Sequence, residues 1–153
     1  MKKALLLALY LCMSASVFSQ KMSKDKNLLI SSIEKHKEEL IKISDSIWAL
    51  AETAFNETES SRILADYAEK NGLKVTRGVA DIPTAFTATY GSGSPVISIL
   101  GEFDALPGIS QKTSPIKEPF KEGAAGHGCG HNMFGTASLG SAIAIKELMD
   151  AGK

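Results

Sequence analysis

Pro95-Val96-Ile97-Ser98-Ile99-Leu100-Gly101-Glu102-Phe103-Asp104 is the stretch on which the prediction of the fold rests. Its first six residues are mostly apolar and include β-branched side chains, which is typical of a central strand buried on both faces. Glu102 and Asp104 follow at the C-terminal end of this strand. Acids in that position of an open α/β sheet commonly border the ligand crevice, so the stretch predicts a central strand with a site beside it.

Helical patterns precede this stretch. From Leu29 to Leu50 apolar residues recur at steps of three and four, which predicts an amphipathic helix with a charged outer face. His36 lies inside the apolar stripe, and we interpret it as a partly buried or boundary histidine rather than a functional one. Asn56 and Glu59 have the spacing of a capping box, which predicts that a second helix begins there.

Strands and a long loop complete the predicted order of elements. The second helix should end at Asn71-Gly72, and alternating residues then predict strands over 73–79 and 84–90. A long loop rich in glycine and proline follows Pro107, and a last helix should cover residues 133–149. This order predicts an α/β sandwich.

Composition limits the possible functions. The chain has 153 residues, enough for one domain, with 17 basic and 17 acidic residues and a formal net charge of zero. This balance predicts neither nucleic acid nor an anionic membrane surface as a partner.

The first nineteen residues have the pattern of a secretory signal peptide. Lys2 and Lys3 precede an apolar run that is too short to span a bilayer, and small residues follow through Ser19. We therefore expect residues 20–153 to form a periplasmic or secreted protein without stable membrane association after signal removal. Lipidation at Cys12 is the alternative, which the bulky residues before it disfavour.

The segment Gly126-His127-Gly128-Cys129-Gly130-His131-Asn132, here called the Cys/His motif, is the second candidate site. Sulfur and imidazole ligands together suit zinc or a similar ion, and an extended backbone would direct Cys129 and His131 to one side. Signal removal would leave Cys129 as a lone thiol without a disulfide partner, which favours the metal hypothesis over a structural or reactive cysteine. The glycine spacing matches neither the dinucleotide nor the phosphate-loop pattern.

Other polar residues near these motifs have two or more interpretations each. Asp104 could bind a metal, orient a metal ligand or cap a loop. Glu102 could be a ligand or an ordinary surface acid. His127 could bind metal, hold substrate or line a turn.

Both motifs, in this order, resemble the zinc-peptidase family of aminoacylases and bacterial glutamate carboxypeptidases. Gly101-Glu102-Phe103-Asp104-Ala105-Leu106-Pro107-Gly108 and the Cys/His motif are similar to its amidohydrolase branch of aminobenzoyl-glutamate hydrolases, auxin-conjugate hydrolases and related dipeptidases. Pro83-Thr84-Ala85-Phe86 and Glu52-x-x-Phe55 also fit that branch. The resemblance covers roughly residues 27–153.

The resemblance implies the N-terminal part of an α/β sandwich with a mixed central sheet. It also implies a hydrolase that cleaves amide bonds in N-acyl or aminoacyl amino acids or dipeptides through two divalent metal ions, zinc or manganese. Cys129 and His131 match metal ligands, Asp104 matches the aspartate that supports catalysis, and Glu102 replaces a family histidine. The complete protein is expected to bind a small-molecule or peptide substrate and to form a homodimer.

The family's general-base glutamate, further ligands and lid domain have no match in this sequence. Because catalytic zinc normally has three protein ligands and a water, we expect the chain to be an incomplete part that is inactive alone. A non-catalytic, exported metal- or peptide-binding module is the alternative hypothesis, and a redox or nucleophilic Cys129 is a third.

Overall fold

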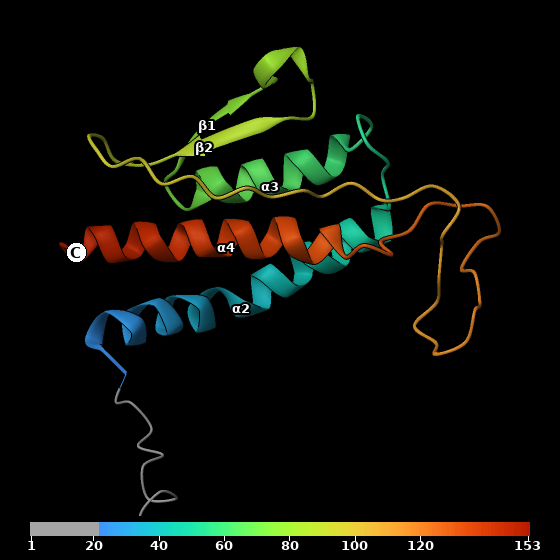
Figure 1. Ribbon diagram of the computed structural model, residues 1–153, viewed down its shortest axis with the longest axis horizontal. Coiled ribbons are helices and arrows are strands. Elements are labelled where there is room, and N and C mark those ends of the chain that lie inside the picture. The colour runs from blue at the N-terminus through green and yellow to red at the C-terminus, as the bar shows by residue number, and fades with distance from the viewer. Residues whose placement is uncertain (1–21) are drawn as a thin grey trace, which may run out of the picture.

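The computed structural model describes residues 22–153, and the predicted signal peptide at residues 1–19 lies outside them. The elements follow one another as three long helices, a hairpin and one short helical turn, shown in Figure 1. They are α2 (Lys24–Leu50), α3 (Thr58–Lys70), β1 (Lys74–Arg77), η1 (Val79–Asp81), β2 (Phe86–Thr89) and α4 (His131–Asp150).

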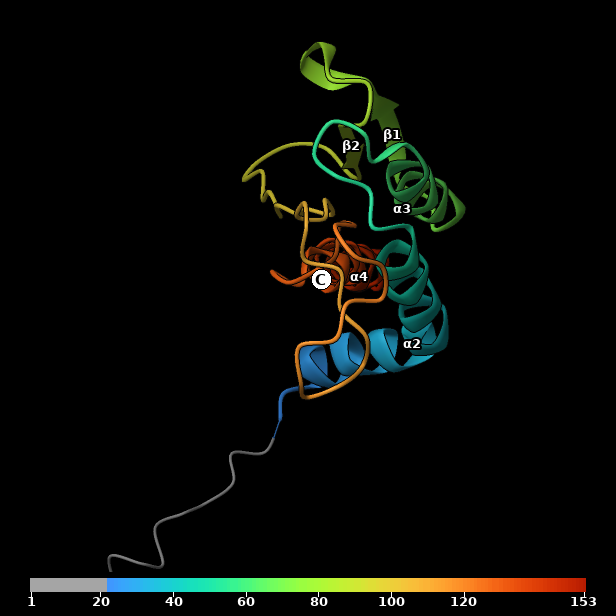
Figure 2. The same ribbon diagram turned by 90° about the vertical axis from the view of Figure 1, so that its right-hand side faces the viewer.

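The three helices form one layer, and the hairpin packs against α3. Helix α4 contacts both α2 and α3, and the view along α4 shows the two beside it (Figure 2). Strands β1 and β2 are antiparallel, with Lys74 opposite Thr89 and Arg77 opposite Phe86. Helices packed with a small sheet confirm the predicted α/β class, and the sheet of the described residues is two-stranded.

The hydrophobic core lies where the three helices and the start of β1 meet. Ile47 and Ile143 are completely buried and Leu64 is 1% exposed, so each helix contributes one fully enclosed side chain. The other core residues are Ile43, Tyr67, Ala68, Leu73 and Leu139. The apolar periodicity predicted for the first two helices is confirmed in part, since the core takes up the C-terminal half of the α2 stripe and the inner face of α3. Ile33 and Leu50 of the predicted stripe are 38% and 40% exposed.

His36 is partly buried, as predicted. Its Nδ1 lies 2.8 Å from the Tyr67 hydroxyl and its Nε2 lies 3.0 Å from Oε1 of Glu147. Lys35 also contacts this carboxylate oxygen, at 2.7 Å. The histidine therefore links α2 to both neighbouring helices.

The predicted capping box of the second helix is wrong. Helix α3 begins at Thr58, and the side chain of Asn56 bonds to Thr53 and Ala54 rather than to the first turn of the helix. The carboxylate of Glu52 instead accepts hydrogen bonds from the backbone amides of Glu59 and Ser60, at 3.1 and 2.8 Å. A carboxylate at this position satisfies free amides and opposes the positive end of the helix dipole, which explains why the asparagine is not needed.

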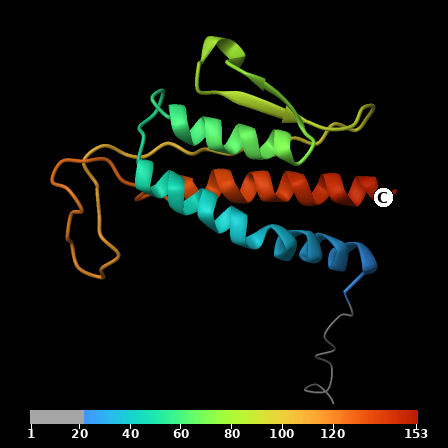
Figure 3. The ribbon, with the colours of Figure 1, turned by 180° about the vertical axis from the view of Figure 1, so that it is seen from behind.

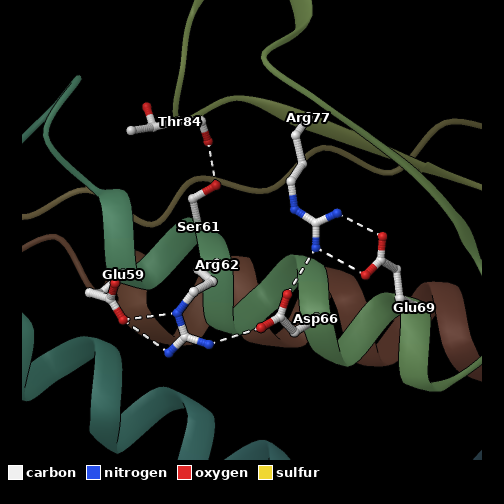
Figure 4. A network of polar contacts seen from close by, with 7 residues as sticks. All are labelled: Glu59, Ser61, Arg62, Asp66, Glu69, Arg77 and Thr84. Carbon is white, nitrogen blue, oxygen red and sulfur yellow. Dashed lines mark hydrogen bonds and ion pairs between the residues drawn. The ribbon is translucent and has the colours of Figure 1, made fainter.

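Polar contacts join the hairpin to α3. The hydroxyl of Ser61 donates to the backbone oxygen of Thr84 at 2.7 Å, beside an exposed network of Arg62, Arg77 and three acids of α3 (Figure 4). The hydroxyl of Thr84 also donates to Glu57 at 2.9 Å, and both residues are buried. This explains the place of the Pro83-Thr84 motif in the fold: it fixes the hairpin on the helix.

The predicted buried strand at 95–100 is wrong for the described residues. This segment pairs with no strand there, and Val96, Ile97 and Leu100 are 82%, 73% and 73% exposed. A strand becomes central only when others pair with both of its edges, and within the described part of the chain β1 and β2 pair with each other. The apolar composition of residues 95–100 predicts a buried strand, but it carries no information on whether other strands pair with its edges.

The long loop and the last helix are confirmed. Residues 107–130 contain no helix or strand, and the loop projects beyond the end of the helices at which α4 begins (Figures 1 and 3). Backbone bonds hold it together, including Ser110 N to Ala124 O and Lys112 N to Glu118 O, both 2.9 Å. None of the helices described is long and apolar enough to cross a membrane.

Candidate metal site

Backbone pairing brings the two motifs together. The amide of Ala105 donates to the carbonyl of Glu52 at 2.7 Å, which fixes the segment after Asp104 beside the end of α2. Leu106 and Gly126 then exchange two backbone hydrogen bonds of 3.0 Å. The acids at 102 and 104 therefore lie next to the Cys/His motif although more than twenty residues separate them.

His131 is the residue on which the two acids converge. It is the first residue of α4, and its Nδ1 lies 2.8 Å from Oδ1 of Asp104. Its Nε2 lies 3.1 Å from Oε2 of Glu102. The side chain of His131 is 16% exposed, that of Asp104 23% and that of Glu102 50%, so the cluster has a protected and an open side. Glu102 and Asp104 point to the same side of their segment, as their spacing predicts.

A glycine makes this approach possible. A Cβ atom added to Gly135, one turn into α4, would lie 2.8 Å from the carbonyl oxygen of Glu102 and 3.2 Å from Cβ of Phe103. Helix α4 therefore packs directly against the backbone that carries the two acids. Its first turn, with His131, is held beside Asp104 as a result.

Cys129 does not join the cluster in the expected way. Gly130 has φ 80° and ψ 23°, so the backbone between Cys129 and His131 is left-handed rather than extended, and the helix begins immediately afterwards. The prediction that an extended backbone directs both side chains to one side is therefore wrong. The Cys129 thiol is free and exposed.

The imidazole of His127 bonds to α2 and to neither of the two acids. Its Nε2 lies 3.0 Å from the backbone oxygen of Ile47, and its Nδ1 is buried without a hydrogen-bond partner among the described residues. Burial lowers the pKa of His127, and the hydrogen bond to Ile47 opposes that shift only in part. Burial therefore disfavours the charged form of this imidazole.

The donor chemistry of the cluster fits part of a metal site. An aspartate that fixes one imidazole nitrogen, so that the other can bind a metal, is a common arrangement around zinc. Asp104 and His131 have this arrangement, with Glu102 next to the free nitrogen. Within residues 22–153, however, no three His, Cys, Asp or Glu side chains are grouped so that they could hold a metal.

Glu52 and Asn132 support the site although the sequence motifs indicate no such role for them. Glu52 joins the start of α3 to Ala105 through its side chain and its carbonyl. The amide of Asn132 donates to the hydroxyl of Ser44 at 3.0 Å, which ties the start of α4 to α2. An acid shortly before a predicted helix was a usable signal for Glu52, whereas the contact of Asn132 depends on tertiary packing.

Comparison with known proteins identifies relatives over most of the chain. No protein-family model matches the sequence. The chain is 44% identical over 119 residues to a subunit of the p-aminobenzoyl-glutamate hydrolase of Escherichia coli (strain K12), which covers 77% of this chain and 25% of that protein. It is 27% identical over 131 residues to human Xaa-Arg dipeptidase, covering 77% of this chain and 26% of that protein.

A third relative extends the range of organisms. The thermostable carboxypeptidase 2 of Saccharolobus solfataricus is 27% identical over 113 residues, covering 72% of this chain and 28% of that protein. The chain thus spans about a quarter of the length of the relatives it matches. Its sequence belongs to the amidohydrolase and peptidase family of these proteins, of which it represents an N-terminal part.

Proposed function

We propose that this chain contributes half of the metal site of a hydrolase that cleaves amide bonds in N-acyl or aminoacyl amino acids or dipeptides. One observation carries the proposal: His131 is fixed by Asp104 at 2.8 Å and directs its second nitrogen to Glu102 at 3.1 Å. The names of three relatives, a hydrolase of an aminobenzoyl-glutamate, a dipeptidase and a carboxypeptidase, support the class of reaction.

Each residue has a distinct part in this proposal. His131 and Cys129 would hold a divalent ion, zinc or manganese, while Asp104 fixes the imidazole through Nδ1 and keeps Nε2 free to bind. Glu102 is a further oxygen donor on the open side of the cluster. The chemistry supplied by bound divalent ions is polarisation of the amide carbonyl and activation of water.

The activity requires ligands beyond those grouped in residues 22–153. Catalytic zinc sites use three protein ligands and an open position, and the described cluster provides fewer. We therefore propose that the chain is inactive alone and that the complete, homodimeric enzyme binds two metal ions. We place the enzyme in the periplasm or outside the cell because of the predicted signal peptide.

Metal binding by the chain tests this proposal. Titration calorimetry with zinc and with manganese is expected to detect binding that Cys129→Ala and His131→Ala each weaken by about ten-fold or more. His36→Gln is the matched control, because His36 bonds to Tyr67 and Glu147 and not to the cluster. Unchanged binding in both site variants would refute the ligand assignment.

A hydrolysis assay separates the enzyme from the alternative of a non-catalytic binding module. N-acyl amino acids and dipeptides are expected to remain intact with the chain and zinc. The chain should hydrolyse them only in a polypeptide that also supplies the missing ligands, and His131→Ala should abolish this activity. A module would bind metal or peptide without hydrolysis in either form.

A further inference from the structure

The hydrogen bond of His127 fixes which of its nitrogens carries the proton. Its Nε2 lies 3.0 Å from the carbonyl oxygen of Ile47. A carbonyl oxygen only accepts hydrogen bonds, so Nε2 must carry a hydrogen and the lone pair of the neutral ring lies on Nδ1. The same carbonyl accepts the amide of Ala51, at 3.1 Å, where α2 ends in a left-handed residue.

This bond anchors the Cys/His motif on its N-terminal side. His127 lies between Gly126 and Gly128, which have no side chains of their own to hold the loop. On the C-terminal side, Asn132 donates to Ser44, one turn earlier on α2 than Ile47. The last turns of α2 thus hold the motif at both ends.

The exposed thiol lies between these two anchors. Within residues 22–153 Cys129 is free, and Gly130 after it is left-handed. Its position relative to His131 therefore depends on the backbone, which is held on one side by the start of α4 and on the other by His127 and by the pairing of Gly126 with Leu106.

We propose that His127 is a positioning residue of the metal site, which acts through its Nε2–H bond to Ile47 and binds neither metal nor substrate. The inference rests on the proposed function for the identity of the ligands, Cys129 and His131. It resolves the three alternatives that the sequence leaves open for this histidine. The side chain fastens the loop to α2.

Two substitutions distinguish the nitrogens of the ring. The amide nitrogen of glutamine reaches approximately the place of Nε2 and can donate there, whereas asparagine reaches only the place of Nδ1, where its amide oxygen supplies an acceptor. His127→Gln therefore keeps the donor to Ile47 and loses the Nδ1 lone pair. His127→Asn has the opposite effect, and His127→Ala removes both groups.

Zinc affinity and the spectrum of bound cobalt report on the site. We expect His127→Gln to bind zinc within about three-fold of the unmodified chain, and His127→Asn and His127→Ala to bind about ten-fold more weakly, as for other supporting residues. The cobalt–thiolate absorption of Cys129 should persist in His127→Gln and weaken in the other two. Rescue by asparagine instead of glutamine would show that Nδ1 is the working atom and would overturn the proposal.

Measurements without metal separate this proposal from the proposed function. Nitrogen NMR of the unmodified chain should show a protonated Nε2 and an unprotonated Nδ1 in His127. Amide exchange over residues 126–132 should be faster in His127→Asn and His127→Ala than in His127→Gln. The reverse tautomer, or equal amide exchange in all variants, would refute the positioning role of His127. If the unmodified chain does not bind zinc but the NMR and exchange results are as expected, only the metal assignment is refuted.

Discussion

The helical layer of α2, α3 and α4, together with the hairpin packed against it, contrasts with the connecting segment, residues 91–130. The layer encloses Ile47, Leu64 and Ile143 almost completely. The connecting segment exposes Val96 and Phe120 by 82% and 72% and has no regular element. The layer thus contains the core, and the connecting segment contains most of the candidate site.

The contrast teaches how the site is held in place. The connecting segment contains four candidate site residues: Glu102, Asp104, His127 and Cys129. Those of them that have a defined hydrogen-bond partner are fixed by a contact to the helical layer. Asp104 contacts the start of α4 and His127 contacts the end of α2. Cys129, by contrast, is free and exposed in the described part of the chain. Rigid helices that position side chains on loops are a general design of functional sites.

The largest expected effect tests whether stability resides in the layer. Ile143→Ala should lower the free energy of unfolding by about 2–5 kcal/mol, because it leaves a cavity in the core. Ile97→Ala, in the connecting segment, should change it by less than about 0.5 kcal/mol, since the side chain is 73% exposed. Urea unfolding of both variants measures the difference. A comparable loss for Ile97→Ala would show that the segment is buried in solution and would remove the contrast.

The second prediction concerns the contact between the two regions. Gly135→Ala should destabilise the chain by about 1–3 kcal/mol, because the new Cβ would lie 2.8 Å from the carbonyl of Glu102. Gly140→Ala on the same helix is the control. Its Cβ would meet only flexible side-chain ends, chiefly that of Leu40, and alanine favours the helix by about 1 kcal/mol.

Thermal melts and the NMR signals of His131 distinguish these two variants. We expect the His131 signals to shift in Gly135→Ala and to stay in place in Gly140→Ala. Equal stability of the two variants would mean that α4 does not press against the backbone of Glu102.

The third prediction is a pH dependence inside the layer. Hydrogen bonds from His36 and then Lys35 lower the pKa of Glu147 from 4.5 to about 2. A carboxylate with a lowered folded-state pKa stabilises the fold above its unfolded pKa, and this stabilisation is lost as the pH falls from about 4.5 to about 2.

Glu147→Gln should therefore cost about 1 kcal/mol at pH 7, a value kept small by the partial exposure of the pair. The difference from the unmodified chain should shrink as the pH falls toward 2. Denaturant unfolding across this range measures it. Glu34→Gln, whose partner Lys37 lies 3.6 Å away on the surface, should show no comparable change. A pH-independent difference would contradict the assignment.

How much the sequence predicts differs between the same two regions. Periodicity locates α2, α3 and α4, because a helix buries a stripe whose spacing is visible in the sequence. It places residues 95–100 in a strand, but pairing depends on neighbours that the pattern does not contain. The prediction of the cap of α3 is wrong for a similar reason. Local propensity favours Asn56 as the capping residue, whereas Glu52, which accepts the helix amides, is brought to them by the turn between α2 and α3.

The candidate site is predicted in its residues more than in its geometry. The motifs select Glu102, Asp104 and His131, which lie together in the structure. The spacing does not reveal the left-handed Gly130 that turns the backbone after Cys129. Nor does it reveal that His127 bonds to α2, because that partner is a backbone carbonyl eighty residues away.

The smallest expected effect concerns the surface of the layer. Arg77 joins the hairpin to α3 through Glu69, at 2.6 Å, and Asp66, at 2.9 Å, and all three side chains are exposed (Figure 4). Water and ions screen such pairs, so Arg77→Gln should lower the unfolding midpoint less than Glu147→Gln does at pH 7. The loss should shrink further in high salt. A large drop of the unfolding midpoint that persists in high salt would show that the hairpin depends on this exposed network. The expected result is that the two buried hydrogen bonds of Thr84 hold the hairpin against the helical layer.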